Sequence, residues 1–243
     1  MNIVERLRAA GCVFAEEEAA LLEEAAESPH HLEELVTHRV NGLPLEHAVG
    51  WAMFCGQRIV VTRGVFVPRH RTELLVDLAA DLNPAVVVDL CCGSGAVGAV
   101  LQHRLPDAEV HAADIDPAAV ACARQNLVNV YEGDLFDALP AHLRGQIDVV
   151  VANVPYVPTL DIPFMPVEAR DHEARVALDG GVDGLEVLRR VAIQATSWLR
   201  PGGHLLSETS ERQAPAALAA FAAAGLTAEL VTSEDSNAVV GRR

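Results

Sequence analysis

The residues best suited to chemistry lie in the tetrapeptide Asn153-Val154-Pro155-Tyr156. It directly follows residues 148–152, an apolar and β-branched run that is typical of a buried parallel strand. Open α/β sheets bind their ligands beyond the carboxyl ends of such strands. An amide side chain, two conformationally restricted residues and an aromatic ring at that position therefore predict a chemical site.

A second candidate site is the glycine-containing turn at residues 91–95, which reads CCGSG. It connects an expected buried strand at 86–90 with a helical pattern at 96–105. Glycine lets the backbone pass close to a ligand, and the start of a helix presents unpaired N–H groups. Gly93, Gly95 and Gly98 also match the G-x-G-x-x-G pattern of dinucleotide-binding proteins. This segment alone fits a dehydrogenase and a methyltransferase about equally well.

Asp89, at the end of the first expected strand, favours the methyltransferase. A carboxylate before the turn would repel a pyrophosphate, whereas it would attract a cation. S-adenosylmethionine carries an ammonium and a sulfonium and has no phosphate. Asp89 would then either hold the turn in shape or bind the ammonium, and simple capping of the turn is the plainer alternative.

Several further motifs, in order along the chain, carry a resemblance to a known family. They are GLPLEH at 42–47, Gly50, VPRHRTELL at 67–75, DLCCGSG at 89–95, Ala113-Asp114, GDLF at 133–136, NVPY at 153–156, ALDGG at 177–181 with Asp183, Gly184 and Leu185, and Glu208. In this combination the chain resembles class I S-adenosylmethionine-dependent methyltransferases, and within them the HemK-type protein N5-glutamine methyltransferases. It departs from the family pattern at two positions, because Cys91 replaces a glycine and Val154 replaces a proline.

The resemblance implies an α/β protein with a Rossmann-like, mostly parallel seven-stranded sheet. Residues 1–50 would form a small helical domain that docks the substrate, residues 51–72 a β-hairpin linker, and residues 73–243 the methyltransferase domain. Hydrophobic spacing agrees with short helices before residue 50. We also expect a helix that starts within 68–72, a long loop at 153–183 and a final antiparallel hairpin after residue 225.

The resemblance also implies which residues hold S-adenosylmethionine. Asp114, at the end of the second strand, would accept hydrogen bonds from both ribose hydroxyls, although it could instead cap the helix at Pro117, as Asp116 could. Asp134 and the Leu135 backbone would meet the adenine edge. The full expected set is Asp89, Cys91, Cys92, Gly93, Ser94, Gly95, Asp114, Ile115, Asp134, Leu135 and Asn153. Arg69 and Arg71 would lie beside the cofactor, between the domains or simply on the surface.

The expected catalytic residues are Asn153, Val154, Pro155 and Tyr156. An amide nitrogen is a poor nucleophile because its lone pair is delocalised into the carbonyl. A protein can nevertheless accept both of its hydrogens in fixed positions and so aim the nitrogen at the methyl group. The Asn153 side-chain oxygen and the Val154 carbonyl are two such acceptors, and the Tyr156 ring would pack on the planar amide.

Composition limits the partners and the compartment. The net charge is −16 and all 18 basic residues are arginine, which makes nucleic acid an unfavourable substrate. Five cysteines without a C-x-x-C pair fit a reducing compartment. The sequence has no membrane-spanning run, signal peptide or metal-binding pattern, and we therefore expect a cytoplasmic protein without a metal. We also expect a monomer.

Three functions remain open from the sequence. The first is methylation of a glutamine in a protein, for which the family implies peptide release factors and their Gly-Gly-Gln loop. The second is methylation of an adenine exocyclic amine, or of another small amide or amine, by similar chemistry. The third is a non-catalytic methyltransferase-like binding protein, which the changes at Cys91 and Val154 would permit.

Overall fold

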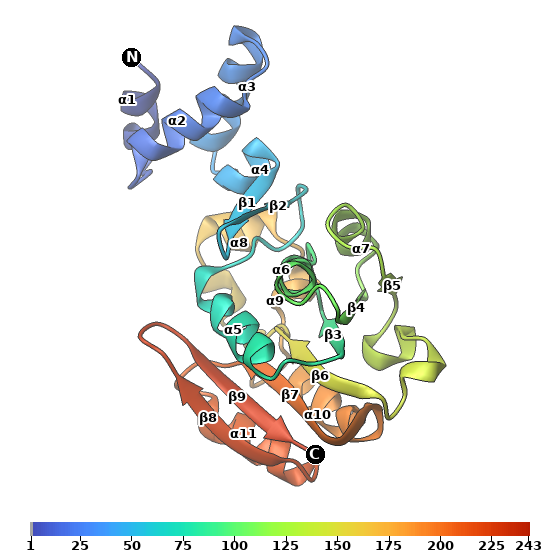
Figure 1. The fold of residues 1–243 in the computed structure, drawn as a ribbon. Helices are drawn as coiled ribbons and strands as arrows, with labels where there is room; N and C mark the ends of the chain where they lie inside the picture. The colour runs from blue at the N-terminus through green and yellow to red at the C-terminus, as the bar shows by residue number, and fades with distance from the viewer. Residues whose placement is uncertain (1) are drawn as a thin grey trace.

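The computed structural model describes residues 2–243 and places a group of helices above a larger α/β unit (Figure 1). The central sheet has seven strands in the order β5-β4-β3-β6-β7-β9-β8. The strands are β3 (Val86–Leu90), β4 (Glu109–Asp114), β5 (Val130–Glu132), β6 (Ile147–Ala152), β7 (Leu199–Glu208), β8 (Thr227–Thr232) and β9 (Asn237–Arg242). All neighbours from β5 to β7 pair in parallel, and β9 is antiparallel to both β7 and β8. The expected fold class is therefore confirmed.

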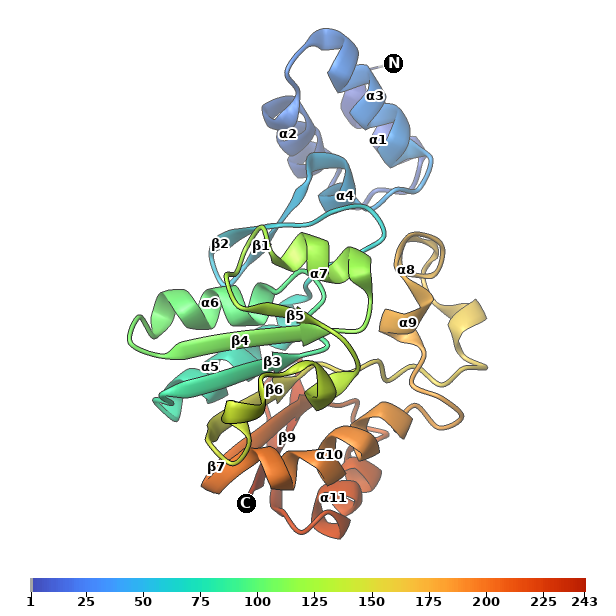
Figure 2. The same ribbon diagram turned by 90° about the vertical axis from the view of Figure 1, so that its right-hand side faces the viewer.

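The two central strands bury side chains on both faces. Val87 and Val149 pack with α5 (Glu73–Asp81), α6 (Ala96–Arg104) and α7 (Pro117–Ala123). Val88 and Val150 pack on the other face with α10 (Glu186–Trp198) and α11 (Ala214–Ala223). Figure 2 shows these two helical layers and the sheet between them. Burial on both faces explains why the strands appear in the sequence as continuous apolar runs.

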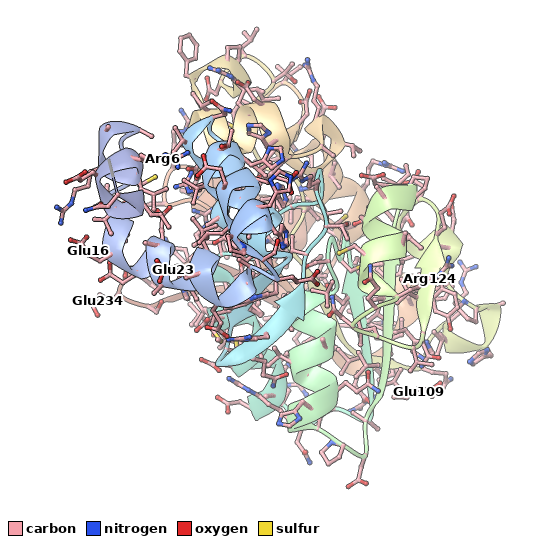
Figure 3. All side chains as sticks on the ribbon, turned by 90° about the horizontal axis from the view of Figure 1, so that it is seen from above. Arg6, Glu16, Glu23, Glu109, Arg124 and Glu234 are labelled. Carbon is pink, nitrogen blue, oxygen red and sulfur yellow. The ribbon has the colours of Figure 1, made fainter. Side chains whose placement is uncertain are left out.

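The first four helices share a separate apolar core. They are α1 (Ile3–Ala9), α2 (Ala15–Ala25), α3 (Pro29–Val40) and α4 (Leu45–Val49). Leu7, Leu22 and Leu35 are buried between them. Glu16 and Glu23 of α2 point outward into solvent (Figure 3), as expected for a solvated face.

A short antiparallel hairpin follows these helices, as the sequence predicts. Its strands β1 (Trp51–Phe54) and β2 (Gln57–Val60) are joined by Cys55 and Gly56, which both have positive φ. Two consecutive residues in that region produce the tight turn that suits the twist of a hairpin. None of the helices in the described part of the chain is both long and apolar enough to cross a bilayer.

The segment at 153–183 differs from the expected loop. It contains η4 (Ile162–Phe164), α8 (Val167–His172) and α9 (Arg175–Leu178). These helices are too short to be evident from hydrophobic spacing. Contacts with residues far away in the sequence hold the segment in place, including a β-bridge between Gly64 and Glu173. Figure 2 shows α8 and α9 beyond the carboxyl ends of the parallel strands.

Three smaller differences concern element ends. The chain stays extended through Arg69, and a short turn, η1 (His70–Thr72), precedes α5. The sequence Pro201-Gly202-Gly203 predicts a turn, but β7 already begins at Leu199, so these residues lie inside an irregular part of that strand. The apolar run at 127–131 predicts a third strand, whereas the observed β5 is shifted toward Glu132.

Arg39 connects the N-terminal helices with α8. Its Nε donates to Glu18 Oε2 at 2.6 Å and its Nη1 to Glu168 Oε1 at 2.6 Å. The same Nη1 also donates to the Leu43 carbonyl at 3.2 Å. The Arg39 and Glu18 side chains are only 9% and 11% exposed, so each needs the other to offset the cost of burial.

We predict that Arg39→Ala lowers the free energy of opening α2 and α3 by about 3 kcal/mol, because it leaves Glu18 buried without its partner. Amide hydrogen exchange measures that free energy. Arg8→Ala is the matched control, since Arg8 pairs with Glu16 on the exposed surface and its loss should cost less than about 1 kcal/mol. Equal effects of the two substitutions would contradict the structural importance of the buried pair.

Candidate active site

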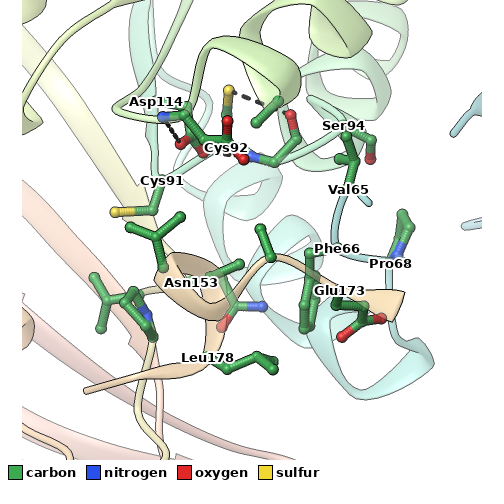
Figure 4. A pocket seen from close by; sticks show the side chains of 18 of the residues that line it. Val65, Phe66, Pro68, Cys91, Cys92, Ser94, Asp114, Asn153, Glu173 and Leu178 are labelled. Carbon is green, nitrogen blue, oxygen red and sulfur yellow. Dashed lines mark hydrogen bonds between the residues drawn. The ribbon is translucent and has the colours of Figure 1, made fainter. Parts of the chain in front are cut away.

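A cavity of about 750 Å³ lies at the carboxyl ends of β3, β4 and β6. This volume is within the usual range for small-molecule and cofactor sites. Residues from the turn after β3, the end of β4 and the tetrapeptide after β6 line it together. Phe66 and Pro68 close it on the hairpin side, and Glu173 and Leu178 on the side of α8 and α9 (Figure 4). The structure thus brings the two candidate sites of the sequence into one cavity.

The turn after β3 is held from within by Asp89. Its Oδ2 accepts the Gly98 N–H at 2.9 Å, and the residue is 2% exposed. Burial raises the pKa of this carboxyl to about 7, and the nearby Asp114 adds to the increase. Of the roles expected for Asp89, the structure shows the one that holds the turn in shape.

Most of the expected turn residues line the cavity, but Gly95 does not. Cys91, Cys92, Gly93 and Ser94 all contribute to the wall. A Cβ added to Gly95 would instead lie 3.1 Å from the Ala123 Cβ. Gly95 therefore allows α6 and α7 to approach each other, which differs from its expected role in the cofactor cradle.

Asp114 has the geometry expected of a ribose acceptor. Its Oδ2 accepts the Gly93 N–H and its Oδ1 the Asp116 N–H, both at 2.9 Å. Each carboxylate oxygen can accept a second hydrogen bond, and the residue lines the cavity. Asp116 caps α7 by accepting the Ala118 N–H, so Asp114 is not needed for that purpose. Burial raises the pKa of Asp114.

The residues expected near adenine follow Gly133, whose N–H donates to the Asp114 carbonyl at 2.9 Å. Leu135 has a φ of +50°, which is unusual for a side chain of its size, and Ile115 is half exposed. Asp134 lines the wall and accepts a hydrogen bond from Arg190 Nη2 at 2.6 Å. Its carboxylate is thus held in place by an arginine of α10 that the sequence did not indicate.

Asn153 directly follows β6 inside the cavity, and its amide is connected to the start of α5 and to the end of β7, the strand beside β6. Its Nδ2 donates to Thr72 Oγ1 at 3.2 Å, and Thr72 Oγ1 donates to Glu208 Oε2 at 2.6 Å. Arg71 Nε donates to the other Glu208 oxygen at 2.6 Å, and Arg71 also donates to the Tyr156 hydroxyl. The sequence left the position of Arg71 open, and the structure places it on the wall beside Tyr156.

Arg69 also lies on the wall, where it pairs with Glu173. Its Nη2 donates to Glu173 Oε1 at 2.5 Å, and the Val67 N–H donates to the same oxygen at 3.2 Å. The Glu173 side chain is fully buried, its Oε2 has no partner within residues 2–243, and burial raises its pKa. Glu173 was not indicated by the sequence, because it lies 104 residues from Arg69 in a segment expected to be a loop.

Comparison with known proteins assigns the family. Residues 57–181 match the family described as Methyltransferase small domain. The chain is 37% identical to the release factor glutamine methyltransferase of Geobacter sulfurreducens, over 84% of this chain and 74% of that protein. It is 38% identical to the release factor glutamine methyltransferase of Streptomyces coelicolor, over 74% of this chain and 67% of that protein. The chain belongs to the release factor glutamine methyltransferase family.

A solved structure supports the fold of this family member. The ribosomal protein L11 methylase from Lactobacillus delbrueckii subsp. bulgaricus superposes with a TM-score of 0.54 at 18% identity. The match covers 76% of this chain and 84% of that one. At this identity the likeness concerns the fold only.

S-adenosylmethionine is the methyl donor of this methyltransferase, and the residues present fit it. Asp114 offers paired acceptors for a ribose, and residues 91–94 of the turn line the cavity beside it. Two desolvated carboxylates, Asp89 and Asp114, make the wall favourable for a cation. Arg190, which also lines the cavity, is paired with Asp134.

The backbone of the tetrapeptide is supported by a segment with two close glycine contacts. A Cβ on Gly180 would lie 2.7 Å from the Pro155 carbonyl oxygen, and one on Gly184 would lie 2.2 Å from that of Tyr156. Gln213 Nε2 donates to the same Tyr156 carbonyl at 2.9 Å and to the Asp183 carbonyl at 3.1 Å. No pattern in the sequence indicated a role for Gln213.

Gly184→Ala should lower the free energy of unfolding of this methyltransferase by about 3 kcal/mol or more, because the new Cβ cannot fit against the Tyr156 carbonyl. Gly225→Ala is the control, since Gly225 also has positive φ (+88° against +76°) but nothing within 4 Å of an added Cβ. Its cost should be only the conformational one, about 1 kcal/mol. Urea unfolding measures both, and similar losses would mean that the contact with Tyr156 is not tight.

Proposed function

We propose that this methyltransferase transfers a methyl group from S-adenosylmethionine to the side-chain amide nitrogen of a glutamine in a peptide release factor. One observation carries the proposal beyond family membership. The Asn153 amide lies in the same cavity as the Asp114 carboxylate, and a chain of hydrogen bonds fixes it there. A fixed amide is suited to orienting another amide, which is the main requirement of this reaction.

The chemistry follows from the weakness of an amide as a nucleophile. Asn153 Oδ1 and the Val154 carbonyl would accept its two hydrogens, while Pro155 restricts the backbone and the Tyr156 ring packs on the amide plane. When bound, the cofactor supplies a methyl group on a sulfonium; the amide nitrogen gains this methyl group and releases one proton to water. No strong base is needed, because the proton becomes acidic only as the new N–C bond forms.

Cofactor residues follow from the cavity wall. We assign Asp114 to the ribose, Asp134 and the Leu135 backbone to the adenine, and Asp89 to the support of the turn. Cys91, Cys92, Gly93, Ser94 and Ile115 would complete the contact surface, and Asn153 would lie between the cofactor and the substrate. Gly95 is left out of this set, because its contacts are with α7.

The N-terminal helices would dock the release factor. The four N-terminal helices form their own core and connect through Arg39 to α8, which lies beside the cavity. The hairpin and residues up to 72 would link this unit to the methyltransferase domain at 73–243. A release factor acts in the cytoplasm, a compartment that fits five cysteines without a disulfide. A monomer remains the prediction for the oligomeric state.

The other two candidate functions have less support. An adenine substrate brings phosphates, and a chain of net charge −16 without lysine is unfavourable for them. A non-catalytic protein would be expected to lose the cavity or its polar groups, yet both are present. No observation favours either alternative over the glutamine substrate.

Asp114→Ala should weaken S-adenosylmethionine binding by about 1.5–3 kcal/mol, roughly 10- to 150-fold, because the ribose loses its acceptors. Isothermal calorimetry measures the affinity. Asp116→Ala is a nearby control that removes the cap of α7, and it should lower the stability of the fold more than the affinity. Unchanged cofactor affinity in Asp114→Ala would contradict the ribose assignment.

Asn153→Ala should reduce methyl transfer to a release factor at least 100-fold, while the cofactor affinity stays within about threefold. The assay is single-turnover transfer of labelled methyl, with mass spectrometry to locate the modified residue. A release factor whose Gly-Gly-Gln glutamine is replaced by alanine should accept no label. If the wild-type enzyme labels nucleic acid, or labels nothing at all while it binds the cofactor, the proposed function is wrong.

A further inference from the structure

Two buried side chains, Thr72 and Glu208, connect the Asn153 amide to Arg71. Thr72, at the start of α5, is 3% exposed, and Glu208, at the end of β7, is 5% exposed. Arg71 Nε and Thr72 Oγ1 occupy the two oxygens of Glu208, both at 2.6 Å. The Tyr156 hydroxyl lies 3.5 Å from the same oxygen as Arg71. The Thr72 hydroxyl and the Glu208 carboxylate are therefore each held by a hydrogen-bond partner on both sides.

The donor and acceptor properties of these groups allow this series of hydrogen bonds only one direction. A carboxylate paired with arginine can only accept hydrogen bonds, so the Thr72 hydroxyl must donate its single hydrogen to Glu208. Thr72 Oγ1 can then only accept from Asn153, which turns the Nδ2 of Asn153 toward it. The Asn153 Oδ1 consequently faces the cavity, and no group within residues 2–243 donates a hydrogen bond to it.

We propose that Thr72 and Glu208 are positioning residues that lock the Asn153 amide with its oxygen toward the substrate, so that the site accepts the N–H of a glutamine and rejects the carboxylate of a glutamate. This inference rests on the proposed function, since it deepens the recognition of the glutamine side chain. A flipped Asn153 would present its NH₂ group instead. Two donors would then face each other across the site, and the discrimination against a carboxylate would be lost.

Glu208→Gln tests the direction of the chain with little change in shape. Arg71 Nε can only donate, so the new amide must place its oxygen toward Arg71 and its NH₂ toward Thr72. Thr72 then has to accept from this amide, and its own hydrogen turns toward Asn153. The Asn153 oxygen is drawn to Thr72, and its NH₂ group enters the cavity.

The first measurement compares binding of the release factor with binding of its variant in which the Gly-Gly-Gln glutamine is glutamate, in the presence of S-adenosylhomocysteine. We expect the wild-type enzyme to prefer the glutamine form at least tenfold. In Glu208→Gln the preference should fall to about threefold or less, or reverse. A preference that stays at the wild-type value would overturn the proposal.

Thr72 provides a matched pair of variants. Thr72→Val removes the hydroxyl and keeps the shape, and it should reduce kcat at least tenfold with cofactor affinity within twofold. Thr72→Ser keeps the hydroxyl and should restore most of the lost rate. A purely structural role would predict the reverse order, since valine preserves the buried volume and serine does not, and that order would overturn the proposal.

Arg71→Met shows whether Glu208→Gln acts by reversing the direction of the hydrogen bonds or only by removing the carboxylate charge. When Glu208→Gln is combined with Arg71→Met, the new amide is free to turn its oxygen toward Thr72. Glu208→Gln should therefore cost at least fivefold less in the Arg71→Met background than in the wild type. Equal costs in both backgrounds would refute the directional chain. A wild-type enzyme that methylates no glutamine would refute the proposed function itself, whereas normal methylation with unaffected variants would refute only this inference.

Discussion

The site depends above all on the parallel pairing of β3 with β6. The register places Val87 beside Val149 and Leu90 beside Ala152, so both strands end at the same edge of the sheet. The turn at 91–95 and Asn153 then start from adjacent positions, although they are about sixty residues apart in sequence. A slip by one residue would exchange the buried faces of β6, and the two apolar layers would no longer match. The core thus fixes the geometry of the chemistry.

Burial of carboxylates is the second physical feature of the cavity. Asp89 and Asp114 both have raised pKa values, mainly because desolvation disfavours their charged forms. A neutral ligand would leave this cost in place, whereas a ligand with positive charge offsets it. Glu173 lies on the other wall and is balanced by Arg69. The cavity therefore has an acidic end that suits a cationic cofactor and a second end where an ion pair holds the side chains of the wall.

The sequence predicted the parts of the fold and site that depend on local pattern. Buried strands such as β3 and β6 are continuous β-branched runs in the sequence. The position of Asp114 in the site was predictable because this residue ends such a strand. The interactions that escaped prediction join distant segments: Thr72 contacts Glu208 across 136 positions, and Gln213 contacts Tyr156 across 57. Gly95 was assigned to the cofactor because a motif cannot tell a glycine that faces a ligand from one that faces a helix. Only the packing of Ala123 against it makes that distinction.

The two departures from the family pattern are compatible with this geometry for related reasons. Val154 precedes Pro155, and a residue before proline is restricted to extended angles near those a proline itself would adopt. Its side chain is 2% exposed and belongs to the apolar core beneath the site. Cys91 adopts a φ of +55°, which costs about 1–2 kcal/mol relative to glycine, and its side chain packs against the same core. Both positions therefore keep the course of the backbone along the cavity and add apolar contacts behind it, so the backbone groups that the proposed reaction uses are retained.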